Sequence, residues 1–390
     1  MAKQQDGYLS AKESRRISKE NRRITDQYEK QRKRKNVPES EYLTQMKNPE
    51  NAVEFDNLHT YFFTDTGVVK SVDGVSFEVP VGKTVGVVGE SGCGKSVTGK
   101  SILRLIQAPG EIREGSSITF DGKDVLAMSK KELRSYRGGQ ASIIFQDALA
   151  SLNPTMTVGK QIMENLLYHR KMSKKEAKAE AVKLLKDVGI PQAEKRVDQY
   201  PHEFSGGMRQ RVMIAIAFAC QPKLLIADEP TTALDVTIQS QIIKLLKQLK
   251  TENHTSILMI THDLGVVASI AERIFVMYSG VIVEKGTSED IFYRARHPYT
   301  KALLRAVPRL DGDKKEQLDS IEGTPPDLIA PPAGCPFAQR CKYCMPICEK
   351  EMPEVTEFGG RHAAACWLHH EMAPKVEGIN DFDEQAGKEV

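Results

Sequence analysis

A glycine-rich stretch near residue 90 carries the residues best suited to hold a phosphate chain. Gly89–Ser96 reads G-x-x-x-x-G-K-S and follows an apolar run, Thr84–Val88, that is typical of a buried strand. We expect a helix to begin at about Gly94, so that backbone N–H groups of the loop converge with the helix N-terminus. Lys95 would reach the β- and γ-phosphates, and the Ser96 hydroxyl would hold Mg²⁺. The stretch predicts a nucleoside triphosphate site that includes Gly89, Ser91, Gly92, Cys93, Gly94, Lys95, Ser96 and Val97.

A second apolar run, Leu224–Glu229, ends in two acids. Asp228 would hold Mg²⁺ through water, and Glu229 would polarise an attacking water as a general base. The alternative is an ordinary buried strand with acids at its exposed end. Between the two runs, Ser205-Gly206-Gly207 opens a helical stretch. Ser205 can cap that helix and the glycines let a phosphate approach the backbone, although alone they would read as a flexible turn.

The order of these motifs resembles the nucleotide-binding subunits of ABC transporters. The resemblance rests on the phosphate loop followed by Gln146, Ser205-Gly206-Gly207, Asp228-Glu229, Asp235 and His262. It implies that ATP and Mg²⁺ bind, and that the serine-glycine signature contacts the γ-phosphate of ATP held by a partner subunit. It further implies that His262 reads the γ-phosphate, Asp235 lies in a dimer contact, and Gln146 senses Mg²⁺ beside a membrane partner. Phe204 and Met208 depart from the usual leucine and glutamine of the signature.

An aromatic cluster, Tyr61-Phe62-Phe63, precedes the phosphate loop. In ABC ATPases an aromatic residue at this distance stacks on adenine, and the spacing favours Phe62. Tyr61 and Phe63 are the rivals, and at least one of the three is expected to pack into the core.

Three longer strings resemble the oligopeptide/dipeptide importer ATPases of the OppD/DppD type: residues 145–154, 233–239 and 297–300. The resemblance covers roughly residues 50–370. It implies an ATP-hydrolysing motor with a homologous ATPase subunit of the OppF/DppF type, two transmembrane permeases and an extracellular peptide-binding protein. The chain would lie on the cytoplasmic face of the cell membrane as a peripheral subunit. The alternatives are the same machinery importing nickel, glutathione or another small solute, and a soluble ABC ATPase that acts on ribosomes or in DNA repair.

Five of the seven cysteines lie between residues 335 and 366. A cytoplasmic protein seldom builds a disulfide framework, so this density suggests either a 4Fe–4S cluster or tetrahedral Zn²⁺. The family resemblance favours 4Fe–4S and implies Cys335, Cys341, Cys348 and Cys366 as ligands. Cys344 is an extra thiol that could replace one of them. Prolines around the cysteines predict a loop-built domain with little core of its own, which a metal would help to hold together.

Composition and patterning set the organisation of the chain. Its 390 residues are 27% charged and 40% apolar with a net charge of +3, as in ordinary soluble proteins. We see neither an apolar run of the roughly 20 residues that span a bilayer nor a secretory signal. The polar, basic residues 1–50 predict a disordered or helical extension, with contact to anionic lipid or to a partner as alternatives; with few aromatics, no nucleic acid is expected.

Alternating strands and helices after residue 50 predict an α/β fold with a mostly parallel sheet covered on both faces. With the resemblance, this becomes a P-loop NTPase core of the ABC type over residues 51–295, with an inserted α-helical subdomain at about 147–205. A cysteine-rich C-terminal domain would follow over 296–370, and a polar tail over 371–390.

Overall fold

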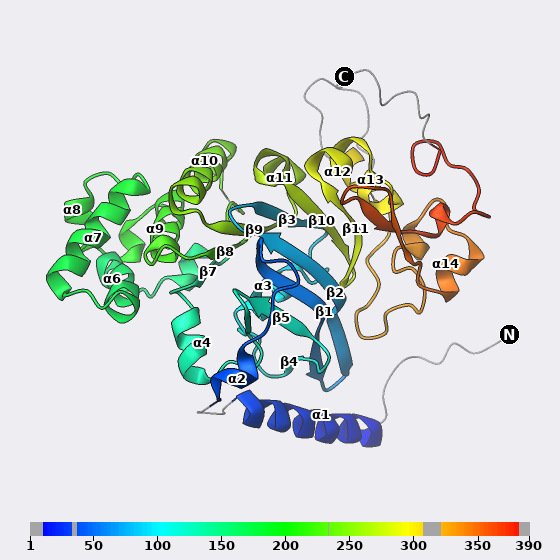
Figure 1. The fold of residues 1–390 in the computed structure, drawn as a ribbon, viewed down its shortest axis with the longest axis horizontal. Coiled ribbons are helices and arrows are strands. Elements are labelled where there is room, and N and C mark those ends of the chain that lie inside the picture. Colours follow the sequence, from blue (N-terminus) through cyan, green and yellow to red (C-terminus); the bar gives the residue numbers. More distant parts are fainter. Residues whose placement is uncertain (1–10, 33–36, 233, 307–320, 382–390) are drawn as a thin grey trace.

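The computed structural model describes residues 11–32, 37–232, 234–306 and 321–381, and within them an eight-stranded sheet forms the centre (Figure 1). Its order is β12-β13-β11-β10-β3-β9-β8-β7, and the five strands from β10 to β7 are parallel. The strands are β3 (Thr84–Val88), β7 (Ala141–Ile144), β8 (Leu224–Asp228), β9 (Ser256–Thr261), β10 (Arg273–Tyr278), β11 (Val281–Thr287), β12 (Val355–Glu357) and β13 (Ala363–Ala365). The predicted strand before the phosphate loop is confirmed.

A second, antiparallel sheet covers one face of this centre. It contains β1 (Asn51–Thr64), β2 (Gly67–Pro80), β4 (Gly110–Ile112), β5 (Ser117–Phe120) and β6 (Lys123–Asp124). The aromatic cluster extends β1 because its residues pair across a tight turn with Val68, Val69 and Lys70 of β2. The central sheet is thus covered on both faces, as the sequence predicts, by helices on one side and by this antiparallel sheet on the other.

Alternate residues of the central strands point into two different cores. In β9, Ile257 and Met259 pack with the helical side, whereas Leu258 and Ile260 pack with the antiparallel sheet. The helical side carries α9 (Gly206–Phe218), α10 (Val236–Asn253), α11 (Leu264–Ile270) and α12 (Ser288–Tyr293). The helix after the phosphate loop, α3 (Lys95–Ile102), lies between the two sheets and contacts strands of both. Both cores therefore buttress the strand that leads into the phosphate loop.

A group of helices extends from the β7 end of the sheet (Figure 1). It comprises α5 (Ala148–Ser151), α6 (Val158–His169), α7 (Lys174–Asp187), α8 (Ala193–Arg196), the 3₁₀ turn η1 (Pro201–Glu203) and α9. Ser173 begins α7 with a capping box, because its side chain and that of Glu176 bond each other's backbone N–H groups. The short α4 (Lys130–Tyr136) begins in the same way, with Ser129 and Glu132.

The N-terminal extension contains a helix, as one of the sequence alternatives predicts. α1 (Ala11–Arg32) runs along the outside of the antiparallel sheet, and α2 (Glu39–Tyr42) follows it (Figure 1). The buried Asn21 side chain of α1 donates to the Thr64 carbonyl at 2.7 Å, which ties the helix to β1. Within the basic residues 1–50, positions 1–10 and 33–36 lie outside the described residues. Within those residues, no helix combines the length and apolarity needed to cross a membrane.

The C-terminal part consists of loops and short elements around β12 and β13. These are α13 (Pro298–Arg305), η2 (Ala338–Arg340), α14 (Pro346–Lys350) and η3 (Trp367–His369). Phe337 and Ala338 join the core of the helical side, so this part shares that core rather than forming its own.

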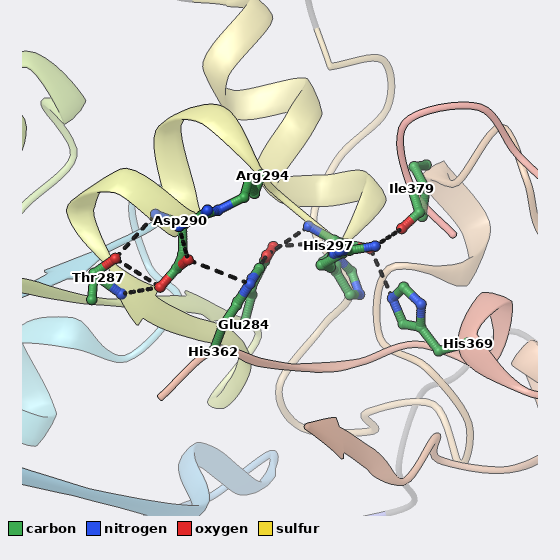
Figure 2. A network of polar contacts seen from close by, with 9 residues as sticks. Glu284, Thr287, Asp290, Arg294, His297, His362, His369 and Ile379 are labelled. Carbon is green, nitrogen blue, oxygen red and sulfur yellow. Dashed lines mark hydrogen bonds and ion pairs between the residues drawn. The ribbon is translucent and has the colours of Figure 1, made fainter. Parts of the chain in front are cut away.

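A buried polar network joins this part to the central sheet (Figure 2). Glu284 of β11 accepts the backbone N–H groups of Arg296 and His297 at 2.6 and 2.9 Å. Its carboxylate also contacts His362 Nε2 at 2.9 Å, just before β13. Three segments thus share one buried carboxylate, which fixes α13 and β13 against β11.

Candidate functional site

The phosphate loop joins β3 to α3 as the motif predicts. Gly94 has φ 103°, and a Cβ there would lie 2.1 Å from the Ser71 carbonyl oxygen, so only glycine fits. Lys95 is 4% exposed, and its Nζ donates to the carbonyls of Gly89 and Glu90 at 2.8 Å each. The lysine ammonium is therefore held inside the curve of the loop, where phosphate oxygens would meet it.

Ser96 and Asp228 meet at the end of β8. The Ser96 hydroxyl donates to Asp228 Oδ1 at 2.6 Å. Burial raises the pKa of the Asp228 carboxyl above its ordinary value, while the Ser96 hydrogen bond opposes the shift. A hydroxyl and a buried carboxylate side by side are the oxygen donors that Mg²⁺ prefers, so the pair fits the predicted metal role.

Glu229 is held by three side chains. Gln146 Nε2 and Thr232 Oγ1 both donate to its Oε2, at 2.9 and 2.8 Å, and His262 Nδ1 lies 3.2 Å from its Oε1. Its backbone has φ 47°, in the left-handed region, and its N–H donates to the Ile260 carbonyl at 2.8 Å. A strained, fully oriented carboxylate is typical of a functional position.

The structure thus brings together Gln146, Glu229 and His262, three residues predicted from separate motifs. Thr232 was missed by the sequence reasoning. The only signal for it is its position three residues after Glu229, in the turn that follows β8, where a hydroxyl can return to the carboxylate.

The three aromatic residues before the phosphate loop have different surroundings. Tyr61 donates to Asp73 Oδ1 at 2.5 Å, and Phe63 is 8% exposed. Phe62 is half-buried and lies on the same face of β1 as Thr60, whose hydroxyl is 2.9 Å from that of Ser101 in α3. Of the three side chains, Phe62 therefore faces the helix that follows the phosphate loop.

The signature lies apart from the phosphate loop. Ser205 caps α9 by accepting from Met208 N, and it is exposed together with Gly206. In Figure 1, α9 lies at the helical end of the sheet, whereas α3 lies at its centre. Phe204 is 2% exposed beneath the Arg196 guanidinium, which explains why a ring is accommodated there.

Asp235 lies next to the signature helix. It caps α10 by accepting from Ile238 N at 2.9 Å, and Ile238 packs against Gly207. Ala233, the first residue of the string that contains Asp235, lies outside the described residues.

The C-terminal thiols gather from three segments. The Cys335 N–H donates to the Cys348 carbonyl at 2.7 Å. Burial, together with the neighbouring cysteines, raises the pKa of Cys335 and Cys366 to about 12 and that of Cys341 to about 11. Cys344 is exposed. In the part of the chain that the structure describes, no group of three or more His, Cys, Asp or Glu side chains has the arrangement of a metal site.

Comparison with known proteins agrees with this geometry. The ABC transporter family matches residues 72–232, and the oligopeptide/dipeptide transporter C-terminal region matches 283–348. The dipeptide transport ATP-binding protein DppD of Bacillus subtilis is 52% identical over 83% of this chain and 96% of its own length. The oligopeptide transport ATP-binding protein OppD of the same organism is 53% identical over 83% and 91%.

A solved structure shares the fold. The ATP-binding cassette MJ0796, a dimer in a post-hydrolysis state with ADP and phosphate, has a TM-score of 0.55 at 26% identity over 60% of this chain and 98% of its own. The shared fold and the family match make this chain an ABC ATPase. The chain belongs to the ABC transporter ATP-binding proteins of the oligopeptide/dipeptide transport family.

Proposed function

We propose that this chain is the ATP-hydrolysing motor subunit of an importer for oligopeptides or dipeptides. The observation that carries the hydrolytic role is the carboxylate of Glu229, which Gln146, Thr232 and His262 orient beside the Ser96–Asp228 pair. The peptide cargo is supported by relatives about half identical to this chain that are named for dipeptide and oligopeptide transport.

The reaction is phosphoryl transfer from ATP to water. Lys95 would bind the β- and γ-phosphates, and Glu229 would accept the proton of the attacking water. Gln146 and Thr232 both donate to Glu229 Oε2. The other carboxylate oxygen, Oε1, faces His262 and would accept the proton of the attacking water. Bound Mg²⁺, held at Ser96 and Asp228 with Gln146 as sensor, would neutralise charge on the phosphates.

We also propose the assembly that the family resemblance implies. Exposed Ser205 and Gly206, far from the phosphate loop of their own chain, would complete the site of a homologous ATPase subunit of the OppF/DppF type, with Asp235 nearby. The dimeric relative supports a second ATPase. Two membrane permeases would dock beside Gln146 on the cytoplasmic face, and an external binding protein would deliver the peptide.

The remaining site assignments are proposals of the same kind. Phe62 would stack on adenine, supported by its position facing α3. The ATPase domain would span 51–295, which contains the family match over 72–232, and the C-terminal domain 296–370, most of which the match over 283–348 covers. Cys335, Cys341, Cys348 and Cys366 would hold a 4Fe–4S cluster, with Zn²⁺ as the alternative and Cys344 as a spare thiol. Their support is that these four thiols, two buried and two partly buried, come from three segments, and that neighbouring cysteines raise the pKa values of Cys335, Cys341 and Cys366.

Two substitutions test the motor and its cargo. Glu229→Gln removes the base and Ser205→Arg blocks the signature, so both should retain ATP binding while reducing ATP hydrolysis by at least ~10²-fold. The measurement is uptake of labelled peptides of two to about eight residues by cells whose only copy carries each variant. Glu194→Gln, on the exposed side of α8, is the matched control and should behave as wild type.

Lost peptide uptake with unchanged uptake of nickel and glutathione would establish the peptide cargo. Normal peptide uptake with loss of nickel or glutathione uptake would overturn it in favour of that solute. Normal ATP hydrolysis by Glu229→Gln would show that the base assignment is wrong.

A further inference from the structure

The second residue of the phosphate loop, Glu90, forms hydrogen bonds with two residues of the C-terminal part of the chain. Arg340 Nη1 donates to Glu90 Oε2 at 2.6 Å, and Nη2 donates to Oε1 at 2.9 Å. The Tyr299 hydroxyl accepts the Glu90 backbone N–H at 2.9 Å. The Glu90 carbonyl in turn accepts from Lys95 Nζ at 2.8 Å. One residue therefore connects the C-terminal part to the lysine that would bind the phosphates.

Arg340 is itself held rigidly. Its side chain is 5% exposed, and its Nε donates to the Glu322 carbonyl at 2.9 Å. Nη1 also donates to the Tyr278 hydroxyl at 3.0 Å, and Nη2 to the Ile321 carbonyl at 3.2 Å. A planar guanidinium that bonds both oxygens of a carboxylate fixes orientation as well as charge. The pair therefore sets the position of the loop where it leaves β3.

The charge of Glu90 gives the pair a second consequence. Its carboxylate is 24% exposed and lies in a loop that must accept a polyanion. A cavity of about 330 Å³ adjoins the loop and is lined by residues 90–93 on one side and by residues 325–328 of the C-terminal part on the other. Without a cation beside it, the Glu90 charge would repel phosphate and attract Lys95 away from it.

We propose that Arg340 is a positioning residue of the nucleotide site, which holds the phosphate loop and neutralises Glu90 so that ATP binds. Tyr299 assists by fixing the Glu90 backbone. The C-terminal part, 250 residues away in sequence, is thus a component of the ATP site. The inference rests on the ATPase function and adds Arg340 and Tyr299, which are not among the residues predicted to contact ATP or Mg²⁺.

The test is ATP affinity of the purified chain, measured by titrating ATP with Mg²⁺ at low and high salt. Arg340→Gln should raise the Kd for ATP about tenfold at low salt. The increase should be smaller at high salt, because ions screen the repulsion between the Glu90 carboxylate and the phosphates. Arg340→Lys should lose less ATP affinity than Arg340→Gln, because lysine keeps the positive charge. Tyr299→Phe should weaken ATP binding slightly, because it removes the hydroxyl that accepts the Glu90 N–H but keeps the packed ring. Arg170→Gln, which removes an arginine paired with Glu180 in the helical region, should leave the Kd unchanged.

The double variant separates this role from a purely structural one. In the Arg340→Gln background, Glu90→Gln should restore most of the lost affinity, because it removes the uncompensated charge. A structural role predicts additive losses and a lower melting temperature without rescue. If wild type binds ATP and Arg340→Gln binds within twofold of it, the inference is wrong while the ATPase function stands. If Arg340→Gln does not fold, the Kd values of Arg340→Lys and Tyr299→Phe test the proposal instead. Both should exceed that of wild type, and values equal to wild type would overturn the proposal. Wild type without ATP binding would overturn the ATPase function itself.

Discussion

At the scale of single residues, the site combines charges that the folded chain holds at a cost. Asp228 is 3% exposed and adjoins Glu229, and burial raises the pKa of its carboxyl, which is the proposed Mg²⁺ ligand. The hydrogen bond from Ser96 and the charges of Lys100 and Lys95 offset part of this rise in the pKa of Asp228. A carboxylate retained under such conditions is better explained by ligand binding than by stability.

Replacing Asp228 with Asn should therefore stabilise the nucleotide-free protein at pH 7, where the buried carboxylate is ionised. The Asn side chain keeps an acceptor for Ser96 and removes the buried charge. Because the folded pKa is raised, ionisation costs stability at pH values above it, and that cost disappears below the ordinary pKa of ~3.9. The gain should accordingly shrink as the pH falls.

Urea unfolding with and without MgATP measures both effects. The Asp228→Asn substitution should abolish the stabilisation by MgATP that wild type shows. Asp198→Asn, on an exposed residue paired with Lys178, is the control. A less stable Asp228→Asn protein would contradict the assignment of a costly charge.

At the scale of elements, a capping side chain and a buried carboxylate hold the start of α13 in place. His297 caps α13 by accepting the Tyr299 N–H on Nδ1, and it lies beside the shared carboxylate of Glu284 (Figure 2). Burial lowers the pKa of His297 to about 4, with Glu284 opposing and His369 adding to the shift. The folded state therefore contains a neutral imidazole over most of the acid range.

This element predicts a pH-dependent stability. The unfolded histidine titrates near 6.5 and the folded one at about 4, so the contribution is complete above pH 6.5 and is lost as the pH falls towards 4. Between pH 7 and 5 we expect a loss of about 2 kcal/mol from this residue. His297→Asn, which can still cap α13, should remove that part of the loss, leaving the smaller part due to His369, whose pKa burial also lowers.

Unfolding free energies of both proteins at pH 7 and pH 5 provide the comparison. The exposed His202→Asn variant should keep the wild-type dependence. An identical pH dependence for His297→Asn and wild type would show that His297 is not the group responsible.

At the scale of the whole molecule, the chain leaves the ATPase body and then returns to it. The central sheet has the helical group at one end and the cysteine-containing part at the other (Figure 1). That part contacts the phosphate loop through Arg340, directly before Cys341. Through the adjacent residues Arg340 and Cys341, the position of the cysteine loop is therefore coupled to the position of the phosphate loop.

The proposed cluster can be tested on the intact chain purified without oxygen. We expect about four iron and four sulfide per chain, together with visible absorption that disappears in Cys366→Ser. Cys344→Ser should retain the metal because Cys344 is the exposed, spare thiol. One zinc per chain, or no metal in freshly purified protein, would overturn the iron–sulfur assignment.

The sequence by itself determined the phosphate loop, the two acids at the end of β8 and the identity of the family. These features are short segments whose chemistry depends on neighbouring residues and on local backbone geometry. Only the tertiary structure decided that β1 and β2 form a separate sheet, that Thr232 joins Gln146 and His262 on Glu229, and that Arg340 grips Glu90. Such contacts join elements that are mostly tens to hundreds of positions apart, and they depend on how whole elements pack, which the periodicity of a single segment does not specify.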